Sequence, residues 1–179
     1  MATAPVPPPP LVPVAQAKDY LRIAGSEEDA LLAGFVRTAS ELCEAFTRLL
    51  LIERDIVETV PARPAWTRLS LAPVRAIESV AALAPAGPAA PLGAADYAID
   101  IDATGEGWVR VLRGGGQKRV EVRYRAGLAS DWNGVPEALR QGVLRMAAHL
   151  YARREAVDGG PPPAAVTALW LPYRRLRLR

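Results

Sequence analysis

The sequence predicts an α+β protein: a small helical bundle, with long N-terminal and C-terminal helices, that carries an inserted antiparallel β lobe. Two observations lead to this fold class. Near both ends of the chain, apolar residues recur at steps of three and four, which is the spacing of one helix face. Between these ends, residues 51–126 hold short alternating runs separated by turns that contain glycine or proline. Short connections of this kind favour antiparallel pairing of neighbouring strands.

The bundle is expected to contain helices over residues 14–24, 27–49 and 135–157. Gly25 is the expected cap of the first helix, and Pro136 suits the first position of the last one. The apolar stripe of the second helix is wider than a surface helix needs. We therefore expect two buried sides, one against the last helix and one against the β lobe or another subunit. The stripe contains Leu31, Phe35, Leu42, Phe46 and Leu49, flanked by Leu32, Val36, Ala39 and Cys43.

The β insertion, residues 51–126, is expected to be a series of short strands. The last of them alternates clearly, with Val120, Val122 and Tyr124 on one face and charged residues on the other. Residues 84–95 form a loop of alanine, proline and glycine. The other strands are expected near Ile52–Val60 and over Trp66–Leu71, Ile77–Leu83, Tyr97–Ile101 and Trp108–Leu112.

Proline-rich segments flank the predicted domain, which spans residues 14–157. Residues 1–13 form an arm in which four consecutive prolines favour polyproline II, either as a disordered tail or as an arm that docks on a neighbouring subunit. Residues 158–179 form a C-terminal segment with a short helix that ends before Pro172 and a tail that alternates apolar and basic residues. We expect this tail to become ordered on a partner.

Composition and charge favour a protein with a real hydrophobic core and no strong nucleic-acid signal. Half of the residues are hydrophobic, and the net charge is only +3. Most of that excess comes from four arginines at the C-terminus, and a basic tail on a near-neutral body is weaker evidence for DNA binding than a basic face. The single cysteine, Cys43, excludes an intramolecular disulfide. We expect no secretory signal and no membrane span.

Cys43 and His149 are the residues that most invite an enzymatic interpretation. A thiol–imidazole dyad across packed helices is conceivable, but both residues lie in or beside apolar stripes and neither has an orienting third group. We expect no catalytic residue, no cofactor and no metal, and therefore a binding or structural protein rather than an enzyme.

Two further patterns have simpler interpretations than ligand binding. The segment Gly114–Arg119 is followed by a strand, so it is expected to be a hairpin turn and not a phosphate loop. A group of acidic residues offers ligands for a hard cation, although a solvated strand face explains it more simply. This group contains Asp96, Asp100, Asp102 and Glu106.

The stretch from Arg119 to Glu155 resembles the head–tail connector, or adaptor, proteins of long-tailed phages and of phage-derived gene transfer agents. It contains a strand that ends Tyr-Arg-Ala-Gly, a short loop, the sequence Val-Pro-Glu-Ala-Leu-Arg-Gln, and a helix that ends Leu-Tyr-Ala-Arg-Arg-Glu. The resemblance continues in Pro13–Arg22, Glu28–Leu32 and Leu171–Leu178, so it extends over most of the chain.

The resemblance implies a structural virion protein, made in the host cytoplasm and located at the head–tail junction. Such a protein forms a twelvefold ring below the portal protein and extends the channel, through which DNA passes without sequence-specific binding. On its other side the ring meets a tail-side connector or tail terminator protein.

By this resemblance, portal docking is assigned to the C-terminal segment, whose leucines would enter apolar grooves and whose arginines would meet carboxylates. We expect removal of residues 170–179 to leave the chain folded. The assigned residues are Trp170, Leu171, Tyr173, Arg174, Arg175, Leu176, Arg177 and Leu178.

The alternative function is a nucleic-acid-binding module that uses the arginine tail and the basic residues of the β hairpin. Glu121 lies among these basic residues, and no aromatic residue is interleaved with them for base stacking, which counts against it. The hairpin residues are Arg113, Lys118, Arg119, Arg123 and Arg125.

Overall fold

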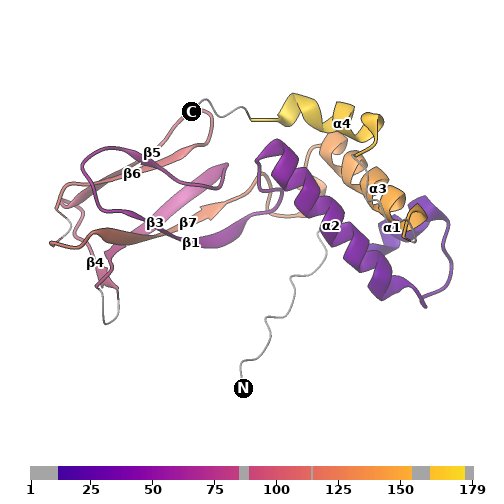
Figure 1. Cartoon of the computed structure of the whole chain (residues 1–179), viewed down its shortest axis with the longest axis horizontal. Coiled ribbons are helices and arrows are strands. Elements are labelled where there is room, and N and C mark those ends of the chain that lie inside the picture. Colours follow the sequence, from indigo (N-terminus) through magenta and orange to yellow (C-terminus); the bar gives the residue numbers. More distant parts are fainter. Residues whose placement is uncertain (1–11, 85–88, 114, 155–161, 176–179) are drawn as a thin grey trace, which may run out of the picture. The chain divides into compact units, whose positions relative to one another are not determined.

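The structure is a computed structural model that describes residues 12–84, 89–113, 115–154 and 162–175. The chain divides into a helical unit, made of residues 1–47 and 131–179, and a β unit, made of residues 48–130 (Figure 1). Helices flank antiparallel sheets in the sequence, so the predicted α+β class with an inserted β lobe is confirmed. Nearly all of the proline-rich arm and the end of the basic tail lie outside the described residues.

The helical unit is built around α2 and α3, which pack along each other, with α1 in contact with both and α4 mainly on α3 (Figure 1). Within the described ranges, no helix is long and apolar enough to span a bilayer. The elements of this unit are α1 (Val14–Leu21), α2 (Asp29–Thr47), η1 (Trp132–Gly134), α3 (Glu137–Ala152), α4 (Ala164–Trp170) and η2 (Leu171–Tyr173).

The first helix ends earlier than predicted, because Arg22 and not Gly25 provides its cap. Arg22 adopts a left-handed backbone with φ of 58°, and the N–H of Ile23 donates to the carbonyl of Lys18 at 3.0 Å. The cap therefore has the usual left-handed geometry, with arginine in the place that glycine commonly takes. Lys18 also pairs with Asp29 at the start of α2, with 2.8 Å between Nζ and Oδ1.

Within one chain, the apolar stripe of α2 is fully buried along one row of side chains. The row Leu32, Val36, Ala39 and Cys43 is fully buried. On the other side, Leu31 and Leu42 are 44% and 36% exposed. Phe35 and Phe46 are half-buried and contact Tyr151 and Trp170, so the stripe is covered on its side toward α3 and α4. The second covered side, against the β lobe or another subunit, stays a prediction. In the single chain, apolar side chains of α2 remain in contact with solvent.

The β unit contains two antiparallel sheets in the part of the chain that the structure describes. The larger has the strand order β1-β7-β3-β4 and the smaller has the order β2-β6-β5. The expected strand over Trp66–Leu71 shrinks to β2, because Ser70 turns away to donate its N–H and its hydroxyl to Glu58. The strands are β1 (Arg54–Pro61), β2 (Thr67–Arg68), β3 (Val74–Ala82), β4 (Ala90–Pro91), β5 (Tyr97–Ile101), β6 (Gly107–Val111) and β7 (Arg119–Ala126).

Strand β7 lies between β1 and β3 and carries the core of the larger sheet. Its alternation is confirmed, because Val120, Val122 and Tyr124 are buried while Arg119 and Arg123 are exposed. Cross-strand apolar pairs of this kind are the unit of sheet stabilisation. The Tyr124 hydroxyl donates to Glu58 at 2.7 Å, so the inner face of the sheet also carries a satisfied polar contact.

The turn from β5 to β6 is organised by Asp102. One carboxylate oxygen, Oδ1, accepts the N–H of Thr104 at 2.8 Å, its hydroxyl at 2.7 Å, and the N–H of Glu106 at 3.0 Å. The other, Oδ2, accepts Nε1–H of Trp108 at 3.1 Å. The Thr104 hydroxyl is the largest of several hydrogen bonds that lower the pKa of Asp102 to about 2. The carboxylate is therefore ionised at neutral pH.

These contacts correct the expectation of a solvated acidic strand face. It holds for Asp100, which is exposed on β5, but Asp102 lies in the turn. Asp96 precedes β5 and lies 3.9 Å from Arg113, while Glu106 pairs with Arg68 at 3.1 Å. Among the described residues, no group of three or more potential metal ligands is brought together.

Asp102 gives a pH-dependent prediction. Its pKa is lower in the folded chain than the roughly 3.9 of an unfolded chain, so its stabilising contribution is present above that value. The contribution is lost as the pH falls toward about 2, where the folded carboxylate is protonated. In Asp102→Asn, the melting temperature should lie below wild type at neutral pH, and this difference should shrink on acidification. A difference that does not change with pH would contradict this role.

Candidate interaction surfaces

The C-terminal segment begins with α4, which two buried side chains attach to the helical unit. Val166 and Trp170 lie one turn apart on the same helix face, and both are buried. Pro163 precedes the helix, and its carbonyl accepts the N–H groups of Val166 and Thr167. The proline suits this position because its ring is pre-set for a helix start. The helix is short, and its packing on α3 holds it in place.

Trp170 is the largest anchor of the segment, since none of its surface is exposed. Its ring lies 5.9 Å from that of Phe46 on α2. On the opposite element, α3, it packs against Gly142. A Cβ atom placed on Gly142 would lie only 2.1 Å from Nε1 of Trp170, so the indole occupies space that any other residue would fill. Gly142 thus allows the close approach of the indole to the α3 backbone.

This packing changes what can be expected of the docking segment. Removal of residues 170–179 would empty the slot of Trp170 in the core, so we expect this truncation to destabilise the helical unit, which argues against the prediction that the chain stays folded. Loss of a buried tryptophan side chain costs about 3–5 kcal/mol, which is a large part of the stability of a domain. Trp170 is therefore an anchor of the segment rather than a side chain free to enter a partner.

The chain beyond Trp170 remains attached to α2 as far as the structure describes it. Leu171 is 55% exposed, whereas the guanidinium of Arg174 lies over the Phe46 ring at 5.3 Å. The N–H of Arg175 donates to the carbonyl of Thr47 at 3.0 Å, which satisfies a carbonyl at the end of α2. Tyr173 belongs to η2 and is half-buried. Leu176, Arg177 and Leu178 fall outside the described residues.

The basic residues of the hairpin do not form a continuous cationic surface. Arg123 pairs with Glu121 on its own strand at 3.0 Å, and Arg125 is the register partner of Asp55 on β1. Arg113 lies 3.9 Å from Asp96, as noted above. The acids interspersed with these arginines reduce the local positive potential on which nucleic-acid binding depends.

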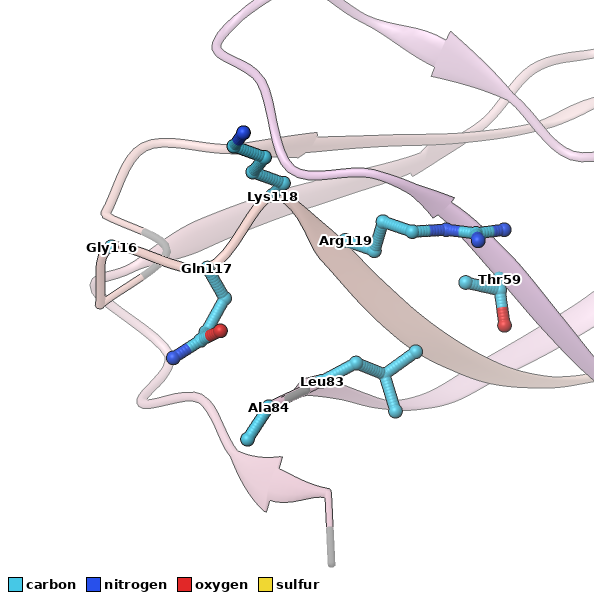
Figure 2. A pocket seen from close by; sticks show the side chains of 7 residues that line it. All are labelled: Thr59, Leu83, Ala84, Gly116, Gln117, Lys118 and Arg119. Atoms are coloured by element: carbon cyan, nitrogen blue, oxygen red, sulfur yellow. The ribbon is translucent and has the colours of Figure 1, made fainter. Parts of the chain in front are cut away.

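Lys118 and Arg119 border an open pocket of about 560 Å³ at the tip of the β unit (Figure 2). In Figure 2 the side chains of Lys118 and Gln117 extend in opposite directions. The apolar part of the wall comes from Leu83 and Ala84 at the end of β3. Residues 115–118 lead into β7, which confirms that this part of the segment is a turn before a strand and not a phosphate loop before a helix. Gly114 lies outside the described residues.

Cys43 has none of the properties of a nucleophile. The residue is fully buried in α2, and burial raises the pKa of its thiol to about 12, with a smaller contribution from Glu44. The thiol is therefore protonated at neutral pH, whereas a nucleophilic cysteine needs its thiolate form. Nε2 of His149 is buried without a hydrogen-bond partner among the described residues.

Gly142 was not identified from the sequence as part of any site. The available signal was a glycine inside a strongly helical pattern, which costs stability unless packing requires it. Its partner Trp170 was assigned to a docking surface, and only the packing of α4 on α3 relates the two residues.

Substitution of Gly142 tests whether Trp170 holds the segment in place. Gly142→Ala should lower the free energy of unfolding by about 1–3 kcal/mol, because the new methyl group overlaps the indole. Gly34→Ala is the matched control in α2, where a Cβ atom would approach nothing closer than 3.9 Å. This control should be neutral or more stable, since alanine favours a helix. Equal stability of the two variants in urea denaturation would contradict the packing argument.

Comparison with known proteins gives matches among solved structures. No protein-family model matches the chain, and no curated protein matches it. A chain from the neck of an empty gene transfer agent (GTA) particle, computed with C6 symmetry, is 28% identical with a TM-score of 0.77. That match covers 94% of this chain and 92% of the other.

Two further matches have the same character. A chain from the virion of a native GTA particle is 27% identical with a TM-score of 0.75, over 94% of this chain and 92% of that one. A chain from the neck of a native GTA particle, computed with C12 symmetry, is 26% identical with a TM-score of 0.74. That match covers 100% of this chain and 98% of the other. This chain is therefore similar, along nearly its whole length, to chains of gene transfer agent necks and virions.

Proposed function

We propose that this protein is a structural component of a virion neck, a head–tail connector that forms a ring below the portal protein. The ring extends the DNA channel and joins the capsid to the tail. The observation that carries this proposal is the similarity to GTA neck chains over 94–100% of the sequence, in both the helical unit and the β unit. A match that includes both units supports a shared role better than a match of one common fold element would.

The exposed apolar residues of the chain support assembly into a ring. Leu31 and Leu42 of α2 are exposed, as are Ile99 and Ile101 of β5. A head-to-tail ring uses two different faces of each copy, and such exposed apolar residues suit faces that become covered on assembly. The neighbour computed with C12 symmetry supports the twelvefold arrangement that the sequence resemblance implies.

Docking to the portal is assigned to the C-terminal segment from Leu171 onward. Trp170 and the Arg175–Thr47 hydrogen bond fix where this segment leaves the helical unit. Leu171 is exposed beside that point and offers an apolar side chain to a groove, while Arg174 offers a guanidinium to a carboxylate. The tail-side partner, a connector or tail terminator protein, would meet another face of the ring.

DNA passes through the ring without sequence-specific binding in this proposal. The hairpin arginines lie among carboxylates, which favours the connector over a nucleic-acid-binding module. The buried, protonated thiol of Cys43 likewise favours a structural role over a thiol hydrolase. A protein of this kind is made in the host cytoplasm and located in the virion, at the head–tail junction.

Co-sedimentation with the cognate portal ring tests this function. The wild-type chain should sediment with the portal, whereas Leu171→Asp should bind at least about tenfold more weakly, because a leucine side chain loses its apolar contact. A chain that ends at Arg175 keeps Trp170 and should fold, yet it should also bind more weakly. Failure of the wild-type chain to sediment with the portal would overturn the proposal.

Leu112→Asp is the matched control for this experiment. Leu112 is 48% exposed in the β unit, close to the exposure of Leu171. The control should bind the portal as the wild type does, and all variants should show wild-type melting temperatures. If Leu171→Asp and the shortened chain bind as tightly as wild type, the C-terminal segment is not the docking element.

A further inference from the structure

The three-stranded sheet carries an aromatic pocket of about 270 Å³, lined by Trp66, Trp108 and Asp100. Val109 and Val111 of β6 are buried, so the alternate residues Trp108 and Arg110 lie on the opposite face of the strand. Trp108 is on that face, and Asp100 is its register partner on β5. We call this site the Trp66–Trp108 pocket.

The indole of Trp108 is held in one orientation. Its Nε1–H donates to Asp102, whose other carboxylate oxygen is fixed by the turn described above. An anionic acceptor increases the electron density of the indole ring, and the negative face of such a ring attracts cations. The wall of the pocket is therefore rigid before any partner arrives.

Trp66 provides the second aromatic wall and remains accessible. The guanidinium of Arg110 covers one face of its ring at 4.7 Å, yet 41% of the residue is exposed. This internal contact is itself a cation–π interaction, which shows that the ring accepts a cation. The other arginine on this face, Arg68, is already paired with Glu106.

The charges around the pocket leave a negative surplus. Two guanidiniums, those of Arg68 and Arg110, accompany three carboxylates, and among the described residues the Asp100 side chain has no hydrogen-bond or ion-pair partner. Two indole rings beside an unpaired carboxylate form a site whose chemistry selects a cationic side chain. The carboxylates around the site are Asp100, Asp102 and Glu106.

We propose that the Trp66–Trp108 pocket receives the ammonium group of Lys118 from a neighbouring copy of this chain, an inference that rests on the ring of the proposed function. The sequence contains two lysines, and the other, Lys18, is paired with Asp29 inside the helical unit. Lys118 is exposed, and its backbone is held by a hydrogen bond from the N–H of Ala62 to its carbonyl at 2.9 Å.

Charge and size favour this occupant. Lys118 forms no ion pair with the described residues, and its side chain extends away from that of Gln117 (Figure 2). A lysine ammonium is a compact charge that fits between two rings and a carboxylate. The pocket and Lys118 are different sites on one copy, so each copy would give a lysine to one neighbour and receive one from the other. This is the head-to-tail pattern that closes a ring.

Zero-length crosslinking of the wild-type protein tests the contact directly. Copies labelled with ¹⁵N and unlabelled copies are mixed, both as concentrated free protein and on portal rings, and treated with a carbodiimide. We expect peptides in which Lys118 of one isotope is joined to Asp100 of the other. Assembly of the chain without this mixed peptide would overturn the inference, as would the absence of self-association in both samples.

Charge reversal supplies an independent readout. Asp100→Lys and Lys118→Asp should each weaken self-association about tenfold, as expected for the loss of a cation–π contact together with an ion pair. The doubly substituted chain should recover most of it, since every contact between copies then contains one lysine and one aspartate again. Asp55→Lys makes the same charge change at an exposed position of β1 and should assemble as wild type.

The outcomes separate this contact from the connector function. If the wild-type chain binds the portal but Asp100→Lys self-associates as strongly as wild type, the pocket is not the contact between copies, and the proposed connector function is unaffected. If copies associate through Lys118 and Asp100 but do not bind the portal, the contact between copies is supported and the proposed binding to the portal is wrong. Failure of the double variant to recover, with both single variants impaired, would also overturn the pairing.

Discussion

The close approach of Trp170 to the backbone of α3 is the constraint on which the C-terminal half of the helical unit depends. A tryptophan needs a slot of its own size in a tightly packed interior. Gly142 provides that slot on one side, and Phe46 of α2 closes it on another. One side chain thereby joins three helices, and it does so at the point where the chain turns toward its exposed end. The C-terminal segment, as far as the structure describes it, is therefore an extension of the core.

The β unit is stabilised by different interactions from those of the helical unit. Its sheets are held by apolar alternation on β7, while polar groups fix its turns and loops. Glu58 receives donors from both Tyr124 and Ser70, and Asp102 fixes the turn beside Trp108. Such charge-assisted hydrogen bonds are stronger than neutral ones, and they hold a surface residue in one orientation without burying it. The result is a rigid surface with exposed aromatic residues.

The sequence predicted the helices, the antiparallel strands and the buried face of β7, because each depends on a local period of side chains. The sequence patterns did not predict features that depend on packing between segments that are distant in the sequence. Trp170 was assigned to a partner through the family resemblance of the C-terminal segment, whereas the slot at Gly142 is visible only in three dimensions. The second covered side of α2 stays a prediction, because another subunit was one of its two expected neighbours. The pocket of Trp66 and Trp108 also joins residues from separate strands, which no local period indicates.

The attachment of the C-terminal segment also determines how the chain responds to mechanical tension. A pull on the chain at Arg175 first loads its attachment to α2, which includes the hydrogen bond from the Arg175 N–H to Thr47 and the cation–π contact of Arg174 with Phe46. Each of these two contacts is weaker than the packing of a fully buried tryptophan side chain. The load then reaches Trp170, whose extraction requires the core between α2 and α3 to open. The attachment of the segment therefore becomes stronger toward Trp170, so small displacements at Arg175 are absorbed before the core between α2 and α3 is strained.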